Sequence, residues 1–268
     1  MSQPTIPLEI RQWSNGVWST EPGSAPAEMP VTLTVNGEAW LEFMCTPEHL
    51  DALAVGFLYN EGMIESAAEI AQVRVCPAND NVDVWTSRSV EKPTRWRMTS
   101  GCAGGVSAAG EEPKAHAVAV PAPPRGMPER FNEVSLTPAQ VNGLVIQLFQ
   151  VQDLHRQSGG IHASALSDGQ RLFLSCEDIG RHNTLDKLAG RVMLENVVEP
   201  RRVVLTTGRV SSEMLQKAAR LGTAIVISCT APTALAVQMA EAWGLTLIGY
   251  AKRERFTLYT HPDRIKAD

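Results

Sequence analysis

The sequence predicts a mixed α/β protein with a β-rich N-terminal region. Apolar residues make up 44% of the 268 residues, which is enough to fill a sizeable core. From residue 135 onward, apolar runs of strand length alternate with segments of helical periodicity, as in α/β layers with a parallel or mixed sheet. The first third instead shows alternating apolar runs separated by turn residues, which predicts hairpins.

Two hairpins are expected near the N-terminus. Alternating apolar residues across 31–43 flank Asn36-Gly37, a dipeptide that tolerates the positive φ of a tight turn. The runs 73–75 and 82–84 form a second candidate hairpin across the polar segment PANDN.

One helix is expected between these hairpins. Thr46 suits its cap and Pro47 its first turn, where a missing backbone N–H costs nothing. Its apolar stripe consists of Leu50, Leu53, Ala54, Phe57 and Leu58.

The C-terminal half carries most of the predicted elements. Thr137 with Gln140 three residues later predicts a capped helix start. Helices are predicted over 141–151, 183–195, 211–221 and 233–243, and strands over 171–176, 202–207, 224–229, 245–250 and 256–259.

Residues 86–128 separate the two halves. They contain few periodic apolar positions and many Gly and Pro, and they end in the linker-like run PAPPRGMP. A loop this long in a compact protein is typically functional or disordered. We therefore expect a β-rich region with one helix over 1–128 and an α/β domain over 129–268.

Composition argues against several functional classes. The net charge is −5, so general affinity for nucleic acid or an anionic membrane is not expected, and a polyanionic ligand would need a local basic patch. No apolar run approaches the roughly 20 residues of a membrane span, and the start lacks a signal-peptide pattern, which predicts a cytoplasmic protein. The five cysteines are odd in number and scattered, unlike a secreted disulfide framework.

Cys102 is the candidate nucleophile. It lies in TSGCAGG (99–105), among three glycines that leave it little side-chain cover, and Arg95 and Arg97 could favour its thiolate. A thiolate on a pliant loop suits attack on another protein's persulfide. The alternative is a flexible turn with an incidental cysteine. The other cysteines, Cys45, Cys76, Cys176 and Cys229, end apolar stretches and suit small buried hydrophobes.

Three further segments follow strands, where open α/β sheets bind ligands. In the first, Asp178, Arg181, His182 and Asn183 are expected to project from the sheet edge; the alternative is capping with a surface ion pair. In the second, Arg209 and the helix start at Ser211 offer a weaker phosphate seat.

The third segment is basic. Its residues could hold a pyrophosphate through cations and stack a base on an aromatic ring, or form a solvated loop. They are Tyr250, Ala251, Lys252, Arg253, Glu254 and Arg255. No zinc-ligand spacing is present, so no metal site is expected, and His162 suits a structural hydrogen bond.

In this order, the segments resemble the FdhD/NarQ family of formate dehydrogenase accessory proteins. The similarity covers most of the chain from about residue 31. It includes TPEHLDALAVGFLYNEGMI (46–64), TSGCAGG (99–105), SGGIHASAL (158–166), CEDIGRHNTLDKLAGR (176–191), TGRVSSEMLQKAA (207–219), SCTAPTALAVQMA (228–240) and LIGYAKRERFTLYTHPDRI (247–265).

The resemblance implies a sulfurtransferase required for formate dehydrogenase activity. It implies that Cys102 receives persulfide sulfur from a cysteine desulfurase and passes it to the molybdenum bis-(molybdopterin guanine dinucleotide) cofactor, whose guanine dinucleotide part is bound by the segment 250–255. It further implies a homodimer and, for the domain over 129–268, a three-layer α/β/α sandwich similar to the cytidine deaminase fold but without its catalytic zinc.

The chain departs from the family pattern at two positions. Many relatives have C-x-x-C in the loop, whereas here Gly105 takes the second place, so this loop cannot form a local disulfide. Glu254 stands where relatives often carry a glycine.

Two other functions remain open. One is a non-catalytic chaperone that escorts the molybdenum cofactor to formate dehydrogenase. The other is a zinc-dependent nucleobase deaminase, against which the missing H-x-E and P-C-x-x-C ligand set speaks.

Overall fold

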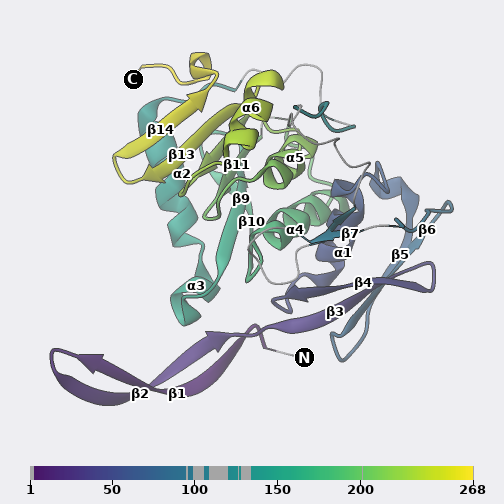
Figure 1. The fold of residues 1–268 in the computed structure, drawn as a ribbon, viewed down its shortest axis with the longest axis horizontal. Coiled ribbons are helices and arrows are strands. Elements are labelled where there is room, and N and C mark those ends of the chain that lie inside the picture. Colours follow the sequence, from purple (N-terminus) through teal and green to yellow (C-terminus); the bar gives the residue numbers. More distant parts are fainter. Residues whose placement is uncertain are drawn as a thin grey trace.

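The structure is a computed structural model, and it describes residues 3–94, 96–98, 106–108, 120–125, 127, 134–200 and 202–267. Within them, a larger mixed sheet with helices on both faces lies beside a smaller sheet and one helix (Figure 1). A narrow two-stranded arm projects from this body.

The smaller sheet has four strands in the order β4-β3-β6-β5. Both predicted hairpins are confirmed, because β3 pairs with β4 and β5 pairs with β6. Asn36 and Gly37 have φ of 51° and 81°, as their tight turn requires. The strands are β3 (Met29–Val35), β4 (Glu38–Cys45), β5 (Ile70–Val75) and β6 (Asn81–Thr86).

Helix α1 (Leu50–Asn60) covers one face of this sheet, and its predicted apolar residues are buried. The expected cap was wrong. The helix begins after His49, and Thr46 lies outside it. Thr46 is fully buried, and its polar groups have partners there. Its backbone N–H donates to Asp178, and its hydroxyl accepts from the N–H of Ile179. These long-range bonds to the larger sheet override local capping.

The larger sheet has six strands in the order β10-β9-β11-β12-β13-β14. Strands β11, β12 and β13 are parallel, and β9 runs antiparallel to both of its neighbours. All five predicted strands are present, together with β9, which was not predicted. The strands are β9 (His162–Ser167), β10 (Leu172–Asp178), β11 (Val203–Thr206), β12 (Ile225–Ser228), β13 (Thr246–Lys252) and β14 (Arg255–Thr260).

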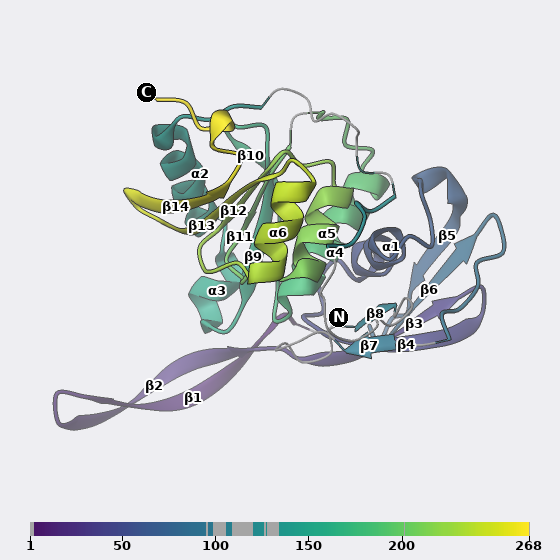
Figure 2. The same ribbon diagram turned by 45° about the horizontal axis from the view of Figure 1, so that its top comes forward.

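Helices cover both faces of this sheet (Figure 2). Helix α2 packs with one set of buried strand residues, and α4, α5 and α6 pack with the alternate set. The predicted capping box is confirmed, since Thr137 accepts from the N–H of Gln140 at the start of α2. The helices are α2 (Pro138–Gln150), α3 (Asp153–Ser158), α4 (Arg181–Leu194), α5 (Ser212–Arg220) and α6 (Ala234–Ala242).

The α/β class with a mixed sheet is therefore confirmed. The finer assignment, a three-layer sandwich similar to the cytidine deaminase fold, stays a prediction, as does the division into 1–128 and 129–268. Residues 128–133, at the predicted boundary, lie outside the described residues.

Helices α1 and α4 join the two sheets through a close crossing. A Cβ atom added to Gly56 would lie 1.7 Å from the carbonyl oxygen of Asp186. One added to Gly190 would lie 1.9 Å from the carbonyl oxygen of Ala52. The two backbones touch at these glycines, so the crossing tolerates no side chain there.

Several short elements complete the described chain. The arm consists of β1 (Thr5–Ser14) and β2 (Val17–Pro26), a hairpin absent from the sequence predictions. Two 3₁₀ turns and a small pair of strands are η1 (Ala67–Glu69), η2 (Pro262–Arg264), β7 (Trp96–Met98) and β8 (Val106–Ala108). Among the described residues, no helix has the length and apolar character needed to cross a membrane.

Candidate functional site

One edge of the larger sheet gathers the chemistry-bearing segments. Because β10, β11, β12 and β13 run the same way, their carboxyl ends meet at this edge, together with the amino ends of β9 and β14. Ligands of open α/β sheets bind beyond such carboxyl ends. A ligand-binding site is therefore expected at this edge.

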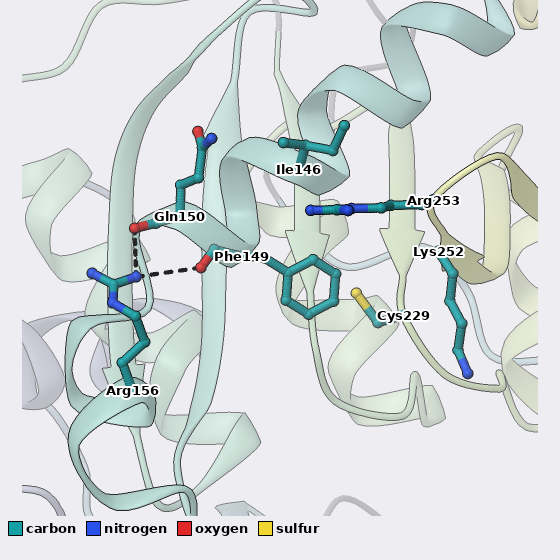
Figure 3. A pocket seen from close by; sticks show the side chains of 7 residues that line it. All are labelled: Ile146, Phe149, Gln150, Arg156, Cys229, Lys252 and Arg253. Carbon is teal, nitrogen blue, oxygen red and sulfur yellow. Dashed lines mark hydrogen bonds between the residues drawn. The ribbon is translucent and has the colours of Figure 1, made fainter.

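A cleft of about 710 Å³ opens at this edge, between the end of α2 and the turn that joins β13 to β14 (Figure 3). Ile146 and Phe149 of α2 form an apolar wall, and Cys229 lies at the end of β12. Lys252 and Arg253 border the cleft from the β13–β14 turn. The remaining lining residues are Gln150 and Arg156.

A second cavity of about 450 Å³ continues along the same edge and shares Phe149 and Cys229 with the cleft. His162 and Thr207 line it at the ends of β9 and β11. The other lining residues are Gln152, His155, Gly159, Gly160 and Ile161. We call the two cavities together the edge cleft.

The edge cleft has a basic side. Lys252 and Arg253 are exposed, and no ion pair is recorded for either within the described part of the chain. Arg156, by contrast, is held by an ion pair with Asp153 and by the carbonyl oxygens of Phe149 and Gln150. Two cations beside an apolar wall suit a ligand with both an anionic and a flat apolar part.

The predicted basic segment is thus partly placed at the site. Lys252 and Arg253 line the cleft, and Glu254 occupies the turn with φ of 61°. Tyr250 is 43% exposed, also with positive φ, while the side chain of Ala251 is buried in the core. A glycine at position 254 would adopt the same φ more readily.

His162 lies beside Thr207 in the wall of the second cavity. Its Nδ1 atom lies 3.5 Å from Thr207 Oγ1, and Thr207 Oγ1 also accepts from the N–H of Ala163. Burial, and next the charge of Arg181, lower the pKa of His162. The neutral form of the ring is therefore favoured over the charged form.

The first of the three predicted segments, which follows β10, is not in the edge cleft. Asp178, Arg181, His182 and Asn183 are all buried, with at most 3% of any residue exposed, so the expectation that they project from the edge was wrong. The alternative of a surface ion pair is also incorrect, because Asp178 pairs with Lys187 at 2.6 Å and both side chains are fully buried.

These buried groups connect the two sheets. Asp178 accepts from the N–H of Thr46, and Lys187 donates to the Thr46 carbonyl oxygen at 3.0 Å. Asn183 donates to the carbonyl oxygen of Met44 at 2.9 Å. Each buried charge thus has several polar partners, as burial of an ion pair requires. Their role in this structure is to fix the smaller sheet against the larger one.

The second of these segments, which follows β11, contributes to the edge cleft through Thr207. Thr207 lines the second cavity, whereas Arg209 is exposed and Ser211 uses its hydroxyl to cap α5 by accepting from the N–H of Met214. Phe149 and Ile146 also line the cleft but were not predicted as site residues. They lie off the buried stripe of α2 and remain 46% and 37% exposed. Large apolar residues on the exposed face of a helix are the sequence signal that could have revealed them.

Cys102 lies outside the described residues, so its proposed role stays a prediction. Three other thiols are unsuited to nucleophilic attack at neutral pH. Burial raises the pKa of Cys45 to about 12, and those of Cys176 and Cys229 to about 11. The expectation of burial holds for Cys45 and Cys176, but Cys229 is only partly buried and Cys76 donates from Sγ to Asp80 near the surface.

Comparison with known proteins identifies the family. The sequence model of the FdhD/NarQ family matches residues 26–266. The chain belongs to the FdhD/NarQ family. It is 35% identical over 244 residues to a protein of Staphylococcus haemolyticus named sulfur carrier protein FdhD, which covers 90% of this chain and 89% of the relative.

Two further comparisons extend the likeness to the whole chain. A Bacillus subtilis protein with the same name is 33% identical over 265 residues, covering 98% of each chain. The crystal structure of a putative formate dehydrogenase accessory protein from Desulfotalea psychrophila matches with a TM-score of 0.75 and 28% identity, covering 98% of this chain and all of that one. The chain therefore has a fold similar to that of this solved structure.

Proposed function

We propose that this FdhD/NarQ family member is a cytoplasmic sulfur carrier that delivers persulfide sulfur to the molybdenum cofactor of formate dehydrogenase. The observation that carries the proposal is the edge cleft, which places two cations without recorded ion pairs beside an apolar wall at the carboxyl edge of the sheet. The names of the family relatives give the sulfur chemistry.

The first step loads sulfur onto Cys102. A cysteine desulfurase presents a persulfide, and the Cys102 thiolate attacks its outer sulfur. A sulfur–sulfur bond forms on Cys102, the corresponding bond on the desulfurase breaks, and the desulfurase cysteine leaves as a thiolate. The electron count is unchanged, so this exchange needs no further reactant.

The edge cleft would hold the acceptor. The substrate is the molybdenum bis-(molybdopterin guanine dinucleotide) cofactor, which combines phosphates with flat heterocycles. Lys252 and Arg253 are placed to bind phosphate oxygens, and Phe149 offers an exposed ring for stacking. The adjacent second cavity gives room for a ligand larger than one nucleotide.

The second step unloads the sulfur. The outer sulfur of the Cys102 persulfide becomes a sulfide ligand of molybdenum, and its bond to the Cys102 sulfur breaks. This step consumes two electrons, because the sulfur arrives at oxidation state zero and ends as sulfide. We assign these electrons to a thiol reductant, which is oxidised to a disulfide while Cys102 returns as a thiolate.

Complementation separates this function from that of a cofactor chaperone. In a strain that lacks this gene and contains a formate dehydrogenase, we expect the wild-type chain to restore formate oxidation and Cys102→Ser to fail at equal protein level. Cys229→Ser is the matched control, since Cys229 lies in the cleft but has a raised pKa. Full activity with Cys102→Ser would instead support a chaperone.

Binding of guanosine diphosphate tests the cleft independently of sulfur. We expect Arg253→Gln and Lys252→Gln each to weaken binding by roughly five- to thirtyfold, as loss of one charge-assisted hydrogen bond predicts. Arg171→Gln is the control, because Arg171 is an exposed cation beside Asp168 on the β9–β10 connection. Equal affinity in all three variants would place the nucleotide elsewhere. Calorimetric titration measures this.

A further inference from the structure

The projecting arm meets α3 of the body at its base and is exposed beyond it. Its strands β1 and β2 pair without irregularity from Thr5–Pro26 to Ser14–Val17 across the turn Asn15-Gly16 (Figures 1 and 2). Its recorded side-chain bonds to the body lie at its base, where Thr5 and Ser24 donate to Gln157 of α3.

Large apolar side chains on this arm are uncovered. Ile6, Leu8 and Ile10 share one face and are 51%, 46% and 40% exposed, because alternate residues of a strand point the same way. On the other face, Trp13 and Trp18 are each 60% exposed. An isolated two-stranded hairpin is only marginally stable in water, whereas three or more strands with an apolar face are stable. The arm therefore lacks the strands that would stabilise it.

The free edge of β1 can accept another strand. Ser14 and Val17 close a two-residue turn, so they form a hydrogen-bonded pair. Hydrogen-bonded and non-hydrogen-bonded pairs alternate along an antiparallel ladder. The backbone groups of Glu9, Arg11 and Trp13 consequently point away from β2, toward solvent.

The free edge of β2 is less suitable. By the same alternation, its outward positions include Pro22 and Pro26, which lack the N–H that a new strand would need. On β1, only Pro7 interrupts the outward row, near the base of the arm. Addition of a strand is thus favoured at β1.

We propose that β1 pairs antiparallel with β1 of a second copy of this chain, about a twofold axis at Ile10. In this register Glu9 lies opposite Arg11 of the partner subunit, and symmetry repeats the pair on the other side of the axis. Two opposite-charge cross-strand pairs then stabilise a four-stranded ribbon.

The charges of Glu9 and Arg11 favour a second copy of the chain as the pairing partner, and they favour this register. The next register in either direction that still pairs outward-pointing residues places Glu9 opposite its own copy or Arg11 opposite its own copy. Like charges directly opposite each other are destabilising. Only the register centred on Ile10 pairs both charges with their opposites. The sequence of this edge is therefore complementary to itself, which favours a second copy over an unrelated partner.

Charge reversal tests the pairing in the full-length chain. We expect the wild-type chain to sediment as a dimer at micromolar concentration. Glu9→Arg and Arg11→Glu should each weaken the dimer on the order of tenfold or more, since each change replaces two attractive pairs by two repulsive ones. The double variant restores opposite charges and should recover the wild-type affinity. A monomeric wild type, or a dimer that neither single change weakens, would overturn the proposal.

Disulfide trapping tests the register. Ile10 on the axis would face its own copy as a non-hydrogen-bonded pair with Cα atoms about 4.5 Å apart, within the range of about 4.4–6.8 Å that a disulfide spans. Ile10→Cys should therefore cross-link on mild oxidation. Leu8→Cys is the matched control, since it has the same face and similar exposure but would lie roughly 13 Å from its copy.

The wild-type chain, which has five cysteines of its own, sets the background for the cross-link. Equal cross-linking of Ile10→Cys and Leu8→Cys, or none above background, would contradict the register. This outcome does not depend on sulfur transfer, because the assay reads arm pairing alone.

Discussion

At the scale of single residues, the buried ion pair between Asp178 and Lys187 determines how the two sheets meet. Asp178 accepts from the backbone N–H of Thr46 and of Gly180 and from the side chain of Asn183, besides pairing with Lys187. The sequence singles out Asp178 as a residue of the ligand-binding edge, with capping and a surface ion pair as the alternative. In sequence, a charged segment after a strand looks the same whether it forms a binding site or a buried junction between sheets. Only the contact with Thr46, which is far away in the sequence, distinguishes these two cases.

Asp178→Asn is expected to destabilise the protein strongly. The change leaves the Lys187 ammonium buried with no carboxylate beside it, and breaking a buried pair in this way costs about 3–5 kcal/mol. Urea denaturation followed by circular dichroism gives the free energy of unfolding. Asp168→Asn is the comparison, because Asp168 is partly exposed and pairs with the exposed Arg171, and pairs near the surface contribute about 0–1 kcal/mol. Equal losses would contradict the role assigned to Asp178.

The thiol of Cys229 is expected to react slowly at neutral pH. Burial raises its pKa to about 11, although the charge of Lys252 acts in the opposite direction. The reactive species is the thiolate, so alkylation by iodoacetamide should rise about tenfold per pH unit until the pKa is reached. Peptide mapping after timed alkylation measures this rate.

Two comparisons define the outcome for Cys229. The chain unfolded in urea, where the thiol has its ordinary pKa, should react much faster at pH 7. Lys252→Met should slow the reaction in the folded protein, since it removes the charge that lowers this pKa. Rates at pH 7 that match the unfolded chain would show that Cys229 is not protected by burial.

At the scale of elements, the crossing of α1 and α4 joins the two parts of the body. Gly190→Ala should destabilise the protein by about 1–3 kcal/mol or more, because the added Cβ atom meets the backbone of Ala52. Gly143→Ala in α2 is the matched control, since no atom lies within 4 Å of its added Cβ atom. That control should gain about 0.5–1 kcal/mol from helix propensity. Thermal unfolding of both variants measures these changes in stability. A stabilised Gly190→Ala would refute the close crossing.

Local signals predicted most elements, and the exceptions have physical causes. The turn at Asn36-Gly37 and the capping box at Thr137 act within a few residues, so sequence reveals them. Strand β9 was missed because a central strand buried on both faces shows no alternation, and its small residues give a weak apolar signal. The arm was not predicted because β2 has few apolar residues, although Ile6, Leu8 and Ile10 of β1 alternate as in a strand and Asn15-Gly16 marks the turn.

At the scale of the whole molecule, sheet topology assembles the candidate site. The segments around His162, Thr207, Cys229 and Lys252 are distant in sequence, yet strand direction brings them to one edge. The basic segment could be predicted because consecutive cations stand out in an acidic chain. Phe149 could not be predicted, because the contribution of α2 to the cleft depends on how that helix packs over the sheet.

The central claim is that Cys102 carries the sulfur, and transfer of labelled sulfur tests it most directly. The full-length chain would be incubated with a cysteine desulfurase and ³⁵S-cysteine, then digested for mass spectrometry without reductant. We predict one labelled sulfur on the peptide that contains Cys102, none in Cys102→Ala, and undiminished labelling in Cys229→Ala. Label that persists in Cys102→Ala at another cysteine would contradict the account.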